Sequence, residues 1–209
     1  GILEQLFCFA TRIEHTFHGS GRVTAQLRIG FIGLGLMGHG MARNLVTKGF
    51  PLTVVGHRNR TPVENLLKLG AKEAKSAAEL AQASDIVFIC VTGSPQVEET
   101  VHRKGGLLDG ARSGLIVVDT STSEPESTMR LAKDLAAKGV TYVDAPLART
   151  PKEAEEGRLN VMVGADDATF AKIEPALKAF AENIFHVGGL GAAHKLKLIN
   201  NFLAMGQAA

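Results

Sequence analysis

Short apolar runs alternate along the chain with longer segments whose apolar residues recur at helical spacing. The runs predict strands near residues 28–32, 52–56, 85–91, 115–119, 141–144, 160–163 and 184–187. Helices are expected to begin near Met37, Pro62, Ala77, Pro95, Pro125 and Asp167. Strands that alternate with helices are typical of a parallel sheet covered on both faces. The pattern therefore predicts an α/β fold with a doubly wound, mostly parallel sheet.

Two of the expected helices carry capping signals at their starts. Ser76 stands three residues before Glu79, which is the spacing of a capping box. Thr61 precedes Pro62, so it is expected to be an N-cap followed by proline in the first helical position.

The last segment has a different pattern. Its apolar residues fall on two sides of one helix, with Leu196, Ile199 and Leu203 on one side and Leu198, Phe202 and Met205 on the other. A helix with two apolar sides needs cover from a further domain or a partner chain. We therefore divide the chain into a poorly ordered lead-in over residues 1–27, a main domain over 28–188 and the start of this helix over 189–209.

Composition narrows the class of protein. Hydrophobic residues make up 45% of the chain and charged residues 21%, as in an ordinary globular protein, and the apolar runs are too short to cross a membrane. A net charge of +2 gives no basic stripe for nucleic acid. The two cysteines fit neither a disulfide framework nor a metal site, so a cytoplasmic protein without metal is expected. Cys90 is interpreted as a small buried hydrophobe, with a reactive thiol as the alternative.

A glycine-rich loop follows the first predicted strand. In GFIGLGLMGHG, the residues Gly33, Gly35 and Gly38 form a G-x-G-x-x-G pattern between a strand and a helix, as the dinucleotide fingerprint of Rossmann-like folds requires. The first glycine permits a tight turn, the second a close approach of the pyrophosphate, and the third close packing of the helix. Leu34, Leu36 and Met37 are expected to contact the cofactor with these glycines.

The choice of cofactor is made at the end of the second strand, where an acid bonds the ribose of NAD and arginine accommodates the 2′-phosphate of NADP. The stretch VVGHRNRTP has no acid, and none occurs between Gly33 and Pro62. The residues there are His57, Arg58, Asn59 and Arg60. This cluster favours NADP, with NAD as the alternative.

Four motifs in order carry a more specific resemblance: FIGLGLMGHGMARNL, DTSTSEP, DAPLARTP with EEGRLNVMVGA, and GLGAAHKLKLINNFLAMG. Together they resemble the β-hydroxyacid dehydrogenase family, which includes 3-hydroxyisobutyrate dehydrogenase. The resemblance covers Leu27 to the C-terminus. It implies that residues 189–209 begin a long interdomain helix, that a helical second domain is missing from this chain, and that the full-length form is a homodimer or larger.

The resemblance also implies the catalytic residues. The family's catalytic lysine precedes an Asn-Asn pair in K-x-x-N-N, which corresponds to Lys197 before Asn200 and Asn201. Helical spacing agrees, because Lys197 and Asn201 are four residues apart on one face whereas Lys195 points elsewhere. Lys197 is expected to act as the general acid and base, with Asn201 orienting the substrate oxygen.

The substrate loop departs from the common family pattern. Where many members have DAPVSGG, this chain has DAPLART, with Arg149 and Thr150 at its end. An Arg-Thr pair at this place is similar to the subgroup that contains sulfolactaldehyde reductase. A guanidinium suits a carboxylate, sulfonate or phosphate, so Arg149 and Thr150 are expected to bind a small anionic substrate.

Two further segments are implied to lie near the nicotinamide. In DTST, Thr122 corresponds to a cofactor-contacting threonine, and Ser121 beside it is expected to contact the substrate. Val91 and Thr92 match a cofactor-contacting turn, although other members usually have Leu-Pro there.

These residues predict an NADP-dependent oxidoreductase that transfers hydride to or from a small hydroxy acid or aldehyde. The alternative is a non-catalytic NADP-binding module or an inactive truncated fragment. A redox-sensing regulator on the same fold is disfavoured, because no DNA-reading element accompanies the fingerprint.

Overall fold

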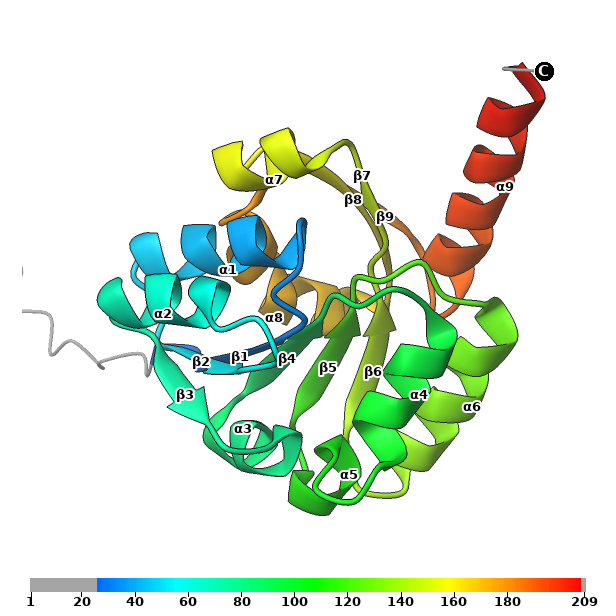
Figure 1. Cartoon of the computed structure of the whole chain (residues 1–209). Coiled ribbons are helices and arrows are strands. Elements are labelled where there is room, and N and C mark those ends of the chain that lie inside the picture. The colour runs from blue at the N-terminus through cyan, green and yellow to red at the C-terminus, as the bar shows by residue number, and fades with distance from the viewer. Residues whose placement is uncertain (1–25, 208–209) are drawn as a thin grey trace, which may run out of the picture.

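The computed structural model of the chain describes residues 26–207. The lead-in predicted over residues 1–27 therefore lies outside the described residues, apart from Gln26 and Leu27. In the described chain one sheet contains the strands β1 (Ile29–Ile32), β2 (Leu52–Val55), β3 (Lys72–Ala74), β4 (Ile86–Ile89), β5 (Ile116–Asp119), β6 (Thr141–Asp144), β7 (Leu147–Ala148), β8 (Leu159–Gly164) and β9 (Ala181–Gly188) (Figure 1).

The sheet has the order β3-β2-β1-β4-β5-β6-β8-β7, and β9 also pairs with β8. All pairs from β3 to β6 are parallel, whereas β8 runs antiparallel to β6 and β7. Only one residue pair, Asp144 with Gly164, joins β6 to β8. The predicted doubly wound, mostly parallel α/β fold is confirmed.

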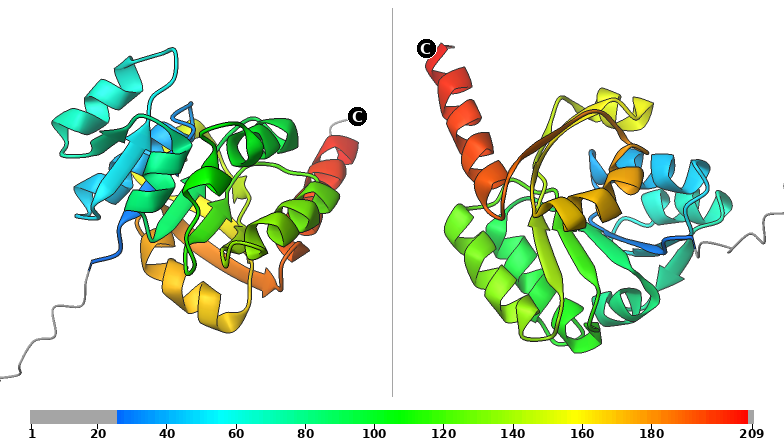
Figure 2. Two further views of the ribbon diagram at one scale, coloured as in Figure 1. Left: turned by 90° about the horizontal axis from the view of Figure 1, so that it is seen from below. Right: turned by 180° about the vertical axis from the view of Figure 1, so that it is seen from behind.

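Helices cover both faces of the sheet. One face carries α1 (Gly38–Thr47), α2 (Thr61–Lys68), α7 (Pro151–Glu156) and α8 (Asp167–Leu177). The other carries α3 (Ala77–Ala83), α4 (Ser94–His102), α5 (Leu107–Gly110) and α6 (Pro125–Ala136). Figure 2 shows α8 on the near side of the sheet when the molecule is seen from behind.

The core explains why the strands are continuous apolar runs. In β1, β4 and β5 all four residues are buried, because side chains that alternate in direction enter two separate cores. Phe31 and Phe88 pack together under α1 and α8, with ring centroids 6.1 Å apart. Val87 and Val117 face the opposite core under α3 to α6. Burial on both faces therefore fixes the strand positions that the sequence predicts.

All seven predicted strands are present, and each predicted helix start lies within one residue of the observed one. The structure adds β3, β7 and the short helices α5 and α7. The start of α7 has the same capping spacing as Ser76 and Glu79, with Thr150 at the N-cap and Glu153 three residues later. The loop that was expected to bind substrate is therefore also a helix start.

The capping predictions have different outcomes. Ser76 caps α3 as predicted, accepting the Glu79 N–H at 3.1 Å, but the Glu79 carboxylate accepts the N–H of Lys75 rather than that of Ser76. Thr61 is the first residue of α2 and not its N-cap, so that prediction is wrong. The side chain of Asn59 accepts the Thr61 N–H at 3.2 Å instead.

The last helix, α9 (Ala192–Gln207), stands away from the rest of the molecule in Figure 1. As the two-sided pattern predicts, large apolar side chains are exposed along it, among them Ile199, Phe202 and Leu203; the side chain of Met205 lies outside the described set. Phe202 is 76% exposed. No helix in residues 26–207 combines the length and apolar character that a membrane crossing needs.

Candidate active site

The predicted site residues meet at one edge of the sheet. In parallel strands the carboxyl ends lie at the same edge, and here the loops after β1, β2, β4, β5 and β6 all leave from it. The chain winds from β1 to β3 in one direction and from β4 to β6 in the other, so the direction reverses between β1 and β4. Ligands of doubly wound folds bind at such a switch point. The glycine loop follows β1 at this place.

The glycine loop has the backbone geometry that its three glycines were predicted to provide. Gly33 has a φ of 96°, and a Cβ there would lie 2.0 Å from the carbonyl oxygen of Cys90. A Cβ on Gly38 would lie 1.9 Å from the Gly33 carbonyl oxygen. A Cβ on Gly35 would meet no atom within 4 Å. The first and third glycines thus serve close packing, whereas Gly35 faces open space.

The start of α1 presents unbonded donors to that space. In the described chain, the backbone N–H groups of Leu34, Gly35, Leu36 and Met37 have no hydrogen-bond acceptor, and the first turn of α1 contains no acidic residue. These donors lie at the positive end of the helix, where an anion is stabilised. The loop therefore fits the pyrophosphate of a dinucleotide.

At the end of β2 the two arginines of the basic cluster differ in their ion-pair partners. His57, Arg58, Asn59 and Arg60 are all exposed. Arg60, however, binds Glu73 of β3 through both terminal nitrogens, at 2.6 and 2.7 Å, and this pairing holds the pKa of Glu73 below its ordinary value. Sequence reasoning found no acid nearby because Glu73 arrives from the neighbouring strand. Among the described residues, Arg58 has no such partner.

The loops after β4 and β5 are joined through Ser121. Its Oγ accepts the N–H of Val91 at 3.0 Å, and its own N–H is donated to Asp119 at 2.9 Å. Ser121 is only 2% exposed, whereas Thr92 and Thr122 are exposed. Ser121 is thus buried and its oxygen accepts a bond from within the protein, while its contact with the substrate stays a prediction. Thr92 and Thr122 are accessible to a cofactor.

Cys90 follows β4 beside the glycine loop and is partly buried against the apolar core. Its environment raises the pKa of the thiol to about 11, because the apolar surroundings disfavour the thiolate. The thiol is therefore protonated near neutrality, and the interpretation of Cys90 as a buried hydrophobe is favoured over a reactive thiol.

Lys197 lies on the less exposed face of α9. Lys197 and Asn201 are half-buried, whereas Lys195, Leu198 and Asn200 are exposed. Partial burial of its ammonium lowers the pKa of Lys197. This is the direction that acid-base chemistry near neutral pH requires.

Arg149 and Thr150 take part in the scaffold of their loop. The Arg149 guanidinium forms an ion pair with Glu182 of β9 and donates to the carbonyl oxygen of Arg158. Its φ of 85° is left-handed, at the place where the common family loop has a glycine. Both the N–H and the hydroxyl of Thr150 are donated to the Glu153 carboxylate. Neither side chain is a vacant anion receptor in this structure.

A buried polar cluster, which sequence reasoning missed, lies beneath these loops. Asp144 accepts the N–H groups of Gly191 and His194 at 2.7 and 2.8 Å, at the entry to α9. Asp119 accepts the hydroxyls of Ser123 at 2.8 Å and Tyr142 at 3.0 Å. Burial, with Asp119 nearby, raises the pKa of Tyr142 well above its ordinary value. The available signal was that each aspartate ends an apolar strand.

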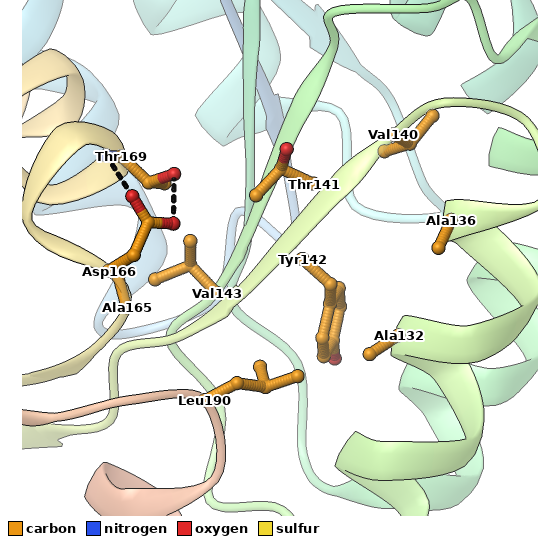
Figure 3. Close-up of a pocket in the computed structure, with 10 residues that line it drawn as sticks. All are labelled: Ala132, Ala136, Val140, Thr141, Tyr142, Val143, Ala165, Asp166, Thr169 and Leu190. Carbon is orange, nitrogen blue, oxygen red and sulfur yellow. Dashed lines mark hydrogen bonds between the residues drawn. The ribbon is translucent and has the colours of Figure 1, made fainter.

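A separate hollow of about 300 Å³ lies beside β6, between α6 and α8. Figure 3 shows the Tyr142 ring and Leu190 in its wall, and the Asp166 side chain bonded to Thr169 at the start of α8. None of the predicted site residues lines it. Residues 26–207 contain no group of three or more His, Cys, Asp or Glu side chains placed to hold a metal ion.

Residues 28–188 match the protein-family model described as the NAD binding domain of 6-phosphogluconate dehydrogenase. The chain is 40% identical over 178 residues to 2-(hydroxymethyl)glutarate dehydrogenase of Eubacterium barkeri, which covers 85% of this chain and 59% of that protein. The chain belongs to the β-hydroxyacid dehydrogenase family. Residues 28–188 of this family member form its NAD(P)-binding domain.

Two more relatives show the same coverage. The 2-hydroxy-3-oxopropionate reductase of Escherichia coli (strain K12) is 38% identical over 180 residues, covering 85% of this chain and 60% of that protein. The solved structure of Psf3 in complex with NADP+ and 2-OPP has a TM-score of 0.77 at 33% identity, covering 83% of this chain and 61% of that one. The chain thus spans about three fifths of the length of the curated relatives it matches.

Proposed function

We propose that the chain contributes to reversible hydride transfer between NADP(H) and a small anionic hydroxy acid or aldehyde. The observation that carries this proposal is the open space at Gly35, beside unbonded N–H donors and on the same sheet edge as Thr92 and Thr122. The relatives support the reaction class, because two of them are named as a dehydrogenase and a reductase of oxygenated acids.

The cofactor, when bound, supplies or accepts the hydride. Gly33, Gly35 and Gly38 would hold its pyrophosphate, and Val91, Thr92 and Thr122 would lie beside it. Lys197 would give the proton to the carbonyl oxygen during reduction, leaving a neutral amine that regains its proton from solvent. In oxidation the amine takes the hydroxyl proton, and Asn201 orients the oxygen in both directions. The lowered pKa of Lys197 supports this role.

NADP is the proposed cofactor, with NAD as the alternative. His57 and Arg58 are exposed at the end of β2, and among the described residues Arg58 is not engaged by an acid. A guanidinium in this position favours a 2′-phosphate. We expect NADPH to bind about tenfold more tightly than NADH, as a fluorescence titration of both would measure; equal affinities would contradict the proposal.

Lys197→Ala tests the catalytic assignment. Turnover in NADPH oxidation should fall by about a hundredfold or more, the usual scale for a positioned general acid, while NADPH affinity stays unchanged. Lys195→Ala is the matched control, because Lys195 lies on the same helix with an exposed side chain, and its effect should be small. Equal losses in the two variants would overturn the role of Lys197.

The substrate is proposed to be anionic and similar to that of the sulfolactaldehyde reductase subgroup. Arg149 must then exchange its ion pair with Glu182 for the substrate anion. Arg149→Ala should cost roughly tenfold in kcat/KM on sulfolactaldehyde or succinic semialdehyde, and little on a neutral aldehyde of similar size. Glu182→Gln frees the guanidinium and should raise kcat/KM on the anions. If Arg149→Ala affected all aldehydes equally, Arg149 would serve only the loop.

A second candidate is a binding module that holds NADP without catalysis. The exposed apolar residues of α9 favour it, because they lie on the same helix as Lys197 and are not covered by the described residues. Tight NADPH binding without NADPH oxidation on any of the aldehydes would select this candidate. Self-association into a homodimer is proposed for the same exposed helix, and light scattering at several chain concentrations would test it.

A further inference from the structure

Three buried titratable side chains have no part in the proposed chemistry. Asp119, Asp144 and His194 are each 0% exposed. Burying a charged or polar side chain is unfavourable unless its hydrogen bonds are made. All three lie where α9 meets the loop after β5, between the segments that carry Lys197 and Thr122. Their bonds therefore show what holds these two segments together.

Asp144 fixes the first turn of α9 on the sheet. It is the last residue of β6, and its two oxygens accept the N–H groups of Gly191 and His194. On the neighbouring strand β8 a Cβ at Gly164 would lie 2.3 Å from the Asp144 Oδ1, so only glycine leaves room for the carboxylate. The start of α9 is thus bonded to β6 through its backbone.

His194 connects α9 to two other elements through its ring. Its Nδ1 lies 2.7 Å from the Thr128 hydroxyl of α6, and its Nε2 lies 3.2 Å from the carbonyl oxygen of Ser121. Because a carbonyl only accepts, Nε2 is the donor to Ser121. The Thr128 hydroxyl lies between Nδ1 and the carbonyl oxygen of Glu124, which is 3.1 Å away. The Asp119 carboxylate is 3.8 Å from the same Nε2.

The bond from His194 completes the fixation of Ser121. The N–H of Ser121 is donated to Asp119, its Oγ accepts the N–H of Val91, and its carbonyl oxygen accepts from His194, so three elements hold this residue. Thr122 follows directly in the chain. On α9, Lys197 lies three residues after His194, which places both on neighbouring parts of one helix face.

We propose that His194 is a positioning residue, which holds Lys197 at a fixed distance from the Ser121–Thr122 loop. The proposal rests on the proposed function for the roles of Lys197 and Thr122. The ring joins α9 to the Ser121–Thr122 loop by one hydrogen bond and to α6 by the other. Both bonds lie in the buried interior, where geometry is held most strictly.

The test uses the 209-residue chain and a matched pair of histidine variants. His194→Leu removes both ring bonds, whereas His194→Gln keeps one donor and one acceptor. His186→Leu is the control, because the Nε2 of His186 also lies 2.7 Å from a backbone carbonyl oxygen, that of Ala165. His186 belongs to β9 and not to the helix that carries Lys197. Thr128→Val removes only the hydroxyl and serves if His194→Leu does not fold.

Three quantities are measured for each variant. They are the thermal midpoint, the amide resonances of Ser121 and Thr122, and the pKa of Lys197 from the NMR titration of 13C-dimethylated lysines, with the Lys197 signal assigned by Lys197→Arg. We expect His194→Leu to shift the two amides and to raise the pKa of Lys197 toward that of a free lysine, because the first turns of α9 loosen and water reaches the ammonium. His194→Gln should restore much of both.

His186→Leu should lower the thermal midpoint while leaving both NMR readouts unchanged. The proposal is overturned if His194→Leu lowers the midpoint but leaves Lys197 and Thr122 as in the unaltered chain, or if His186→Leu moves them as far. If Lys197→Arg retained full NADPH oxidation, the proposed function would fail, yet the NMR comparison would still decide whether His194 positions the helix.

Discussion

The two ends of the candidate site are built in opposite ways. At the glycine loop, one contiguous segment presents backbone N–H groups to open space. At the entry to α9, side chains from β5, β6, α6 and α9 meet in a buried cluster of hydrogen bonds. The first end needs particular backbone conformations, whereas the second needs particular partners. Substitutions at the entry to α9 should therefore lower stability, whereas substitutions at the glycine loop should lower cofactor affinity.

The largest effect is expected at the buried end. Asp144→Ala leaves the N–H groups of Gly191 and His194 unsatisfied in the interior, so the free energy of unfolding should fall by about 3 to 5 kcal/mol in urea denaturation. Asp166→Ala is the matched control, because Asp166 also accepts a helix N–H but is exposed. It should cost about 1 kcal/mol, the usual value of a cap. Similar losses in both would remove the contrast between the two ends.

The glycine loop should lose binding without losing stability. Gly35→Ala places a methyl group where the structure has no atom within 4 Å, so the chain should fold normally while NADPH affinity falls by about tenfold or more. Gly189→Ala is the control, because its Cβ would also meet open space outside the loop. A Gly35→Ala variant that bound NADPH normally would place the pyrophosphate elsewhere.

The smallest effect is expected at the edge of the cofactor end. Arg58→Ala should weaken NADPH binding about fivefold and leave NADH binding unchanged, because an exposed charge contributes modestly. Arg60→Ala should matter less, since its guanidinium is already bound to Glu73. Calorimetric titration of both variants with both cofactors makes the comparison. The reverse order would mean that Arg60 leaves Glu73 when the cofactor binds.

The same contrast decides how much could be predicted from the sequence. The glycine loop is contiguous, so the G-x-G-x-x-G pattern with its flanking strand and helix could be predicted from the sequence. The strands that are buried on both faces could be predicted from their apolar runs. The fold followed from their alternation. Lys197 and Asn201 were placed by resemblance and by helical spacing, and the structure adds that their face of α9 is the less exposed one.

What could not be predicted depends on residues far apart in the chain. Glu73 reaches Arg60 only because β3 lies beside β2, and His194 reaches Ser121 across 73 positions. The free guanidinium expected at Arg149 is bound by Glu182, which β9 brings beside its loop. Such pairings leave no local pattern. The capping signal at Thr150 and Glu153 is local, but Thr150 was interpreted as a substrate contact instead of a helix cap.

Helix α9 is bonded to the domain at its start and exposed along the rest of its length, which gives it the character of a lever. Asp144 pairs with Gly164 of β8 and anchors the helix start, and His194 holds the same turn to α6 and to the loop after β5, so the fixed end of the lever is the first turn of α9. The 16 residues of α9 extend roughly 24 Å at the usual helical rise. A tilt of about 5° at this fixed end would move the far end by about 2 Å but Lys197, near the fixed end, by far less. Lys197, the proposed proton donor, thus lies near the fixed end of the helix, and a movement at the far end displaces it less than the tip.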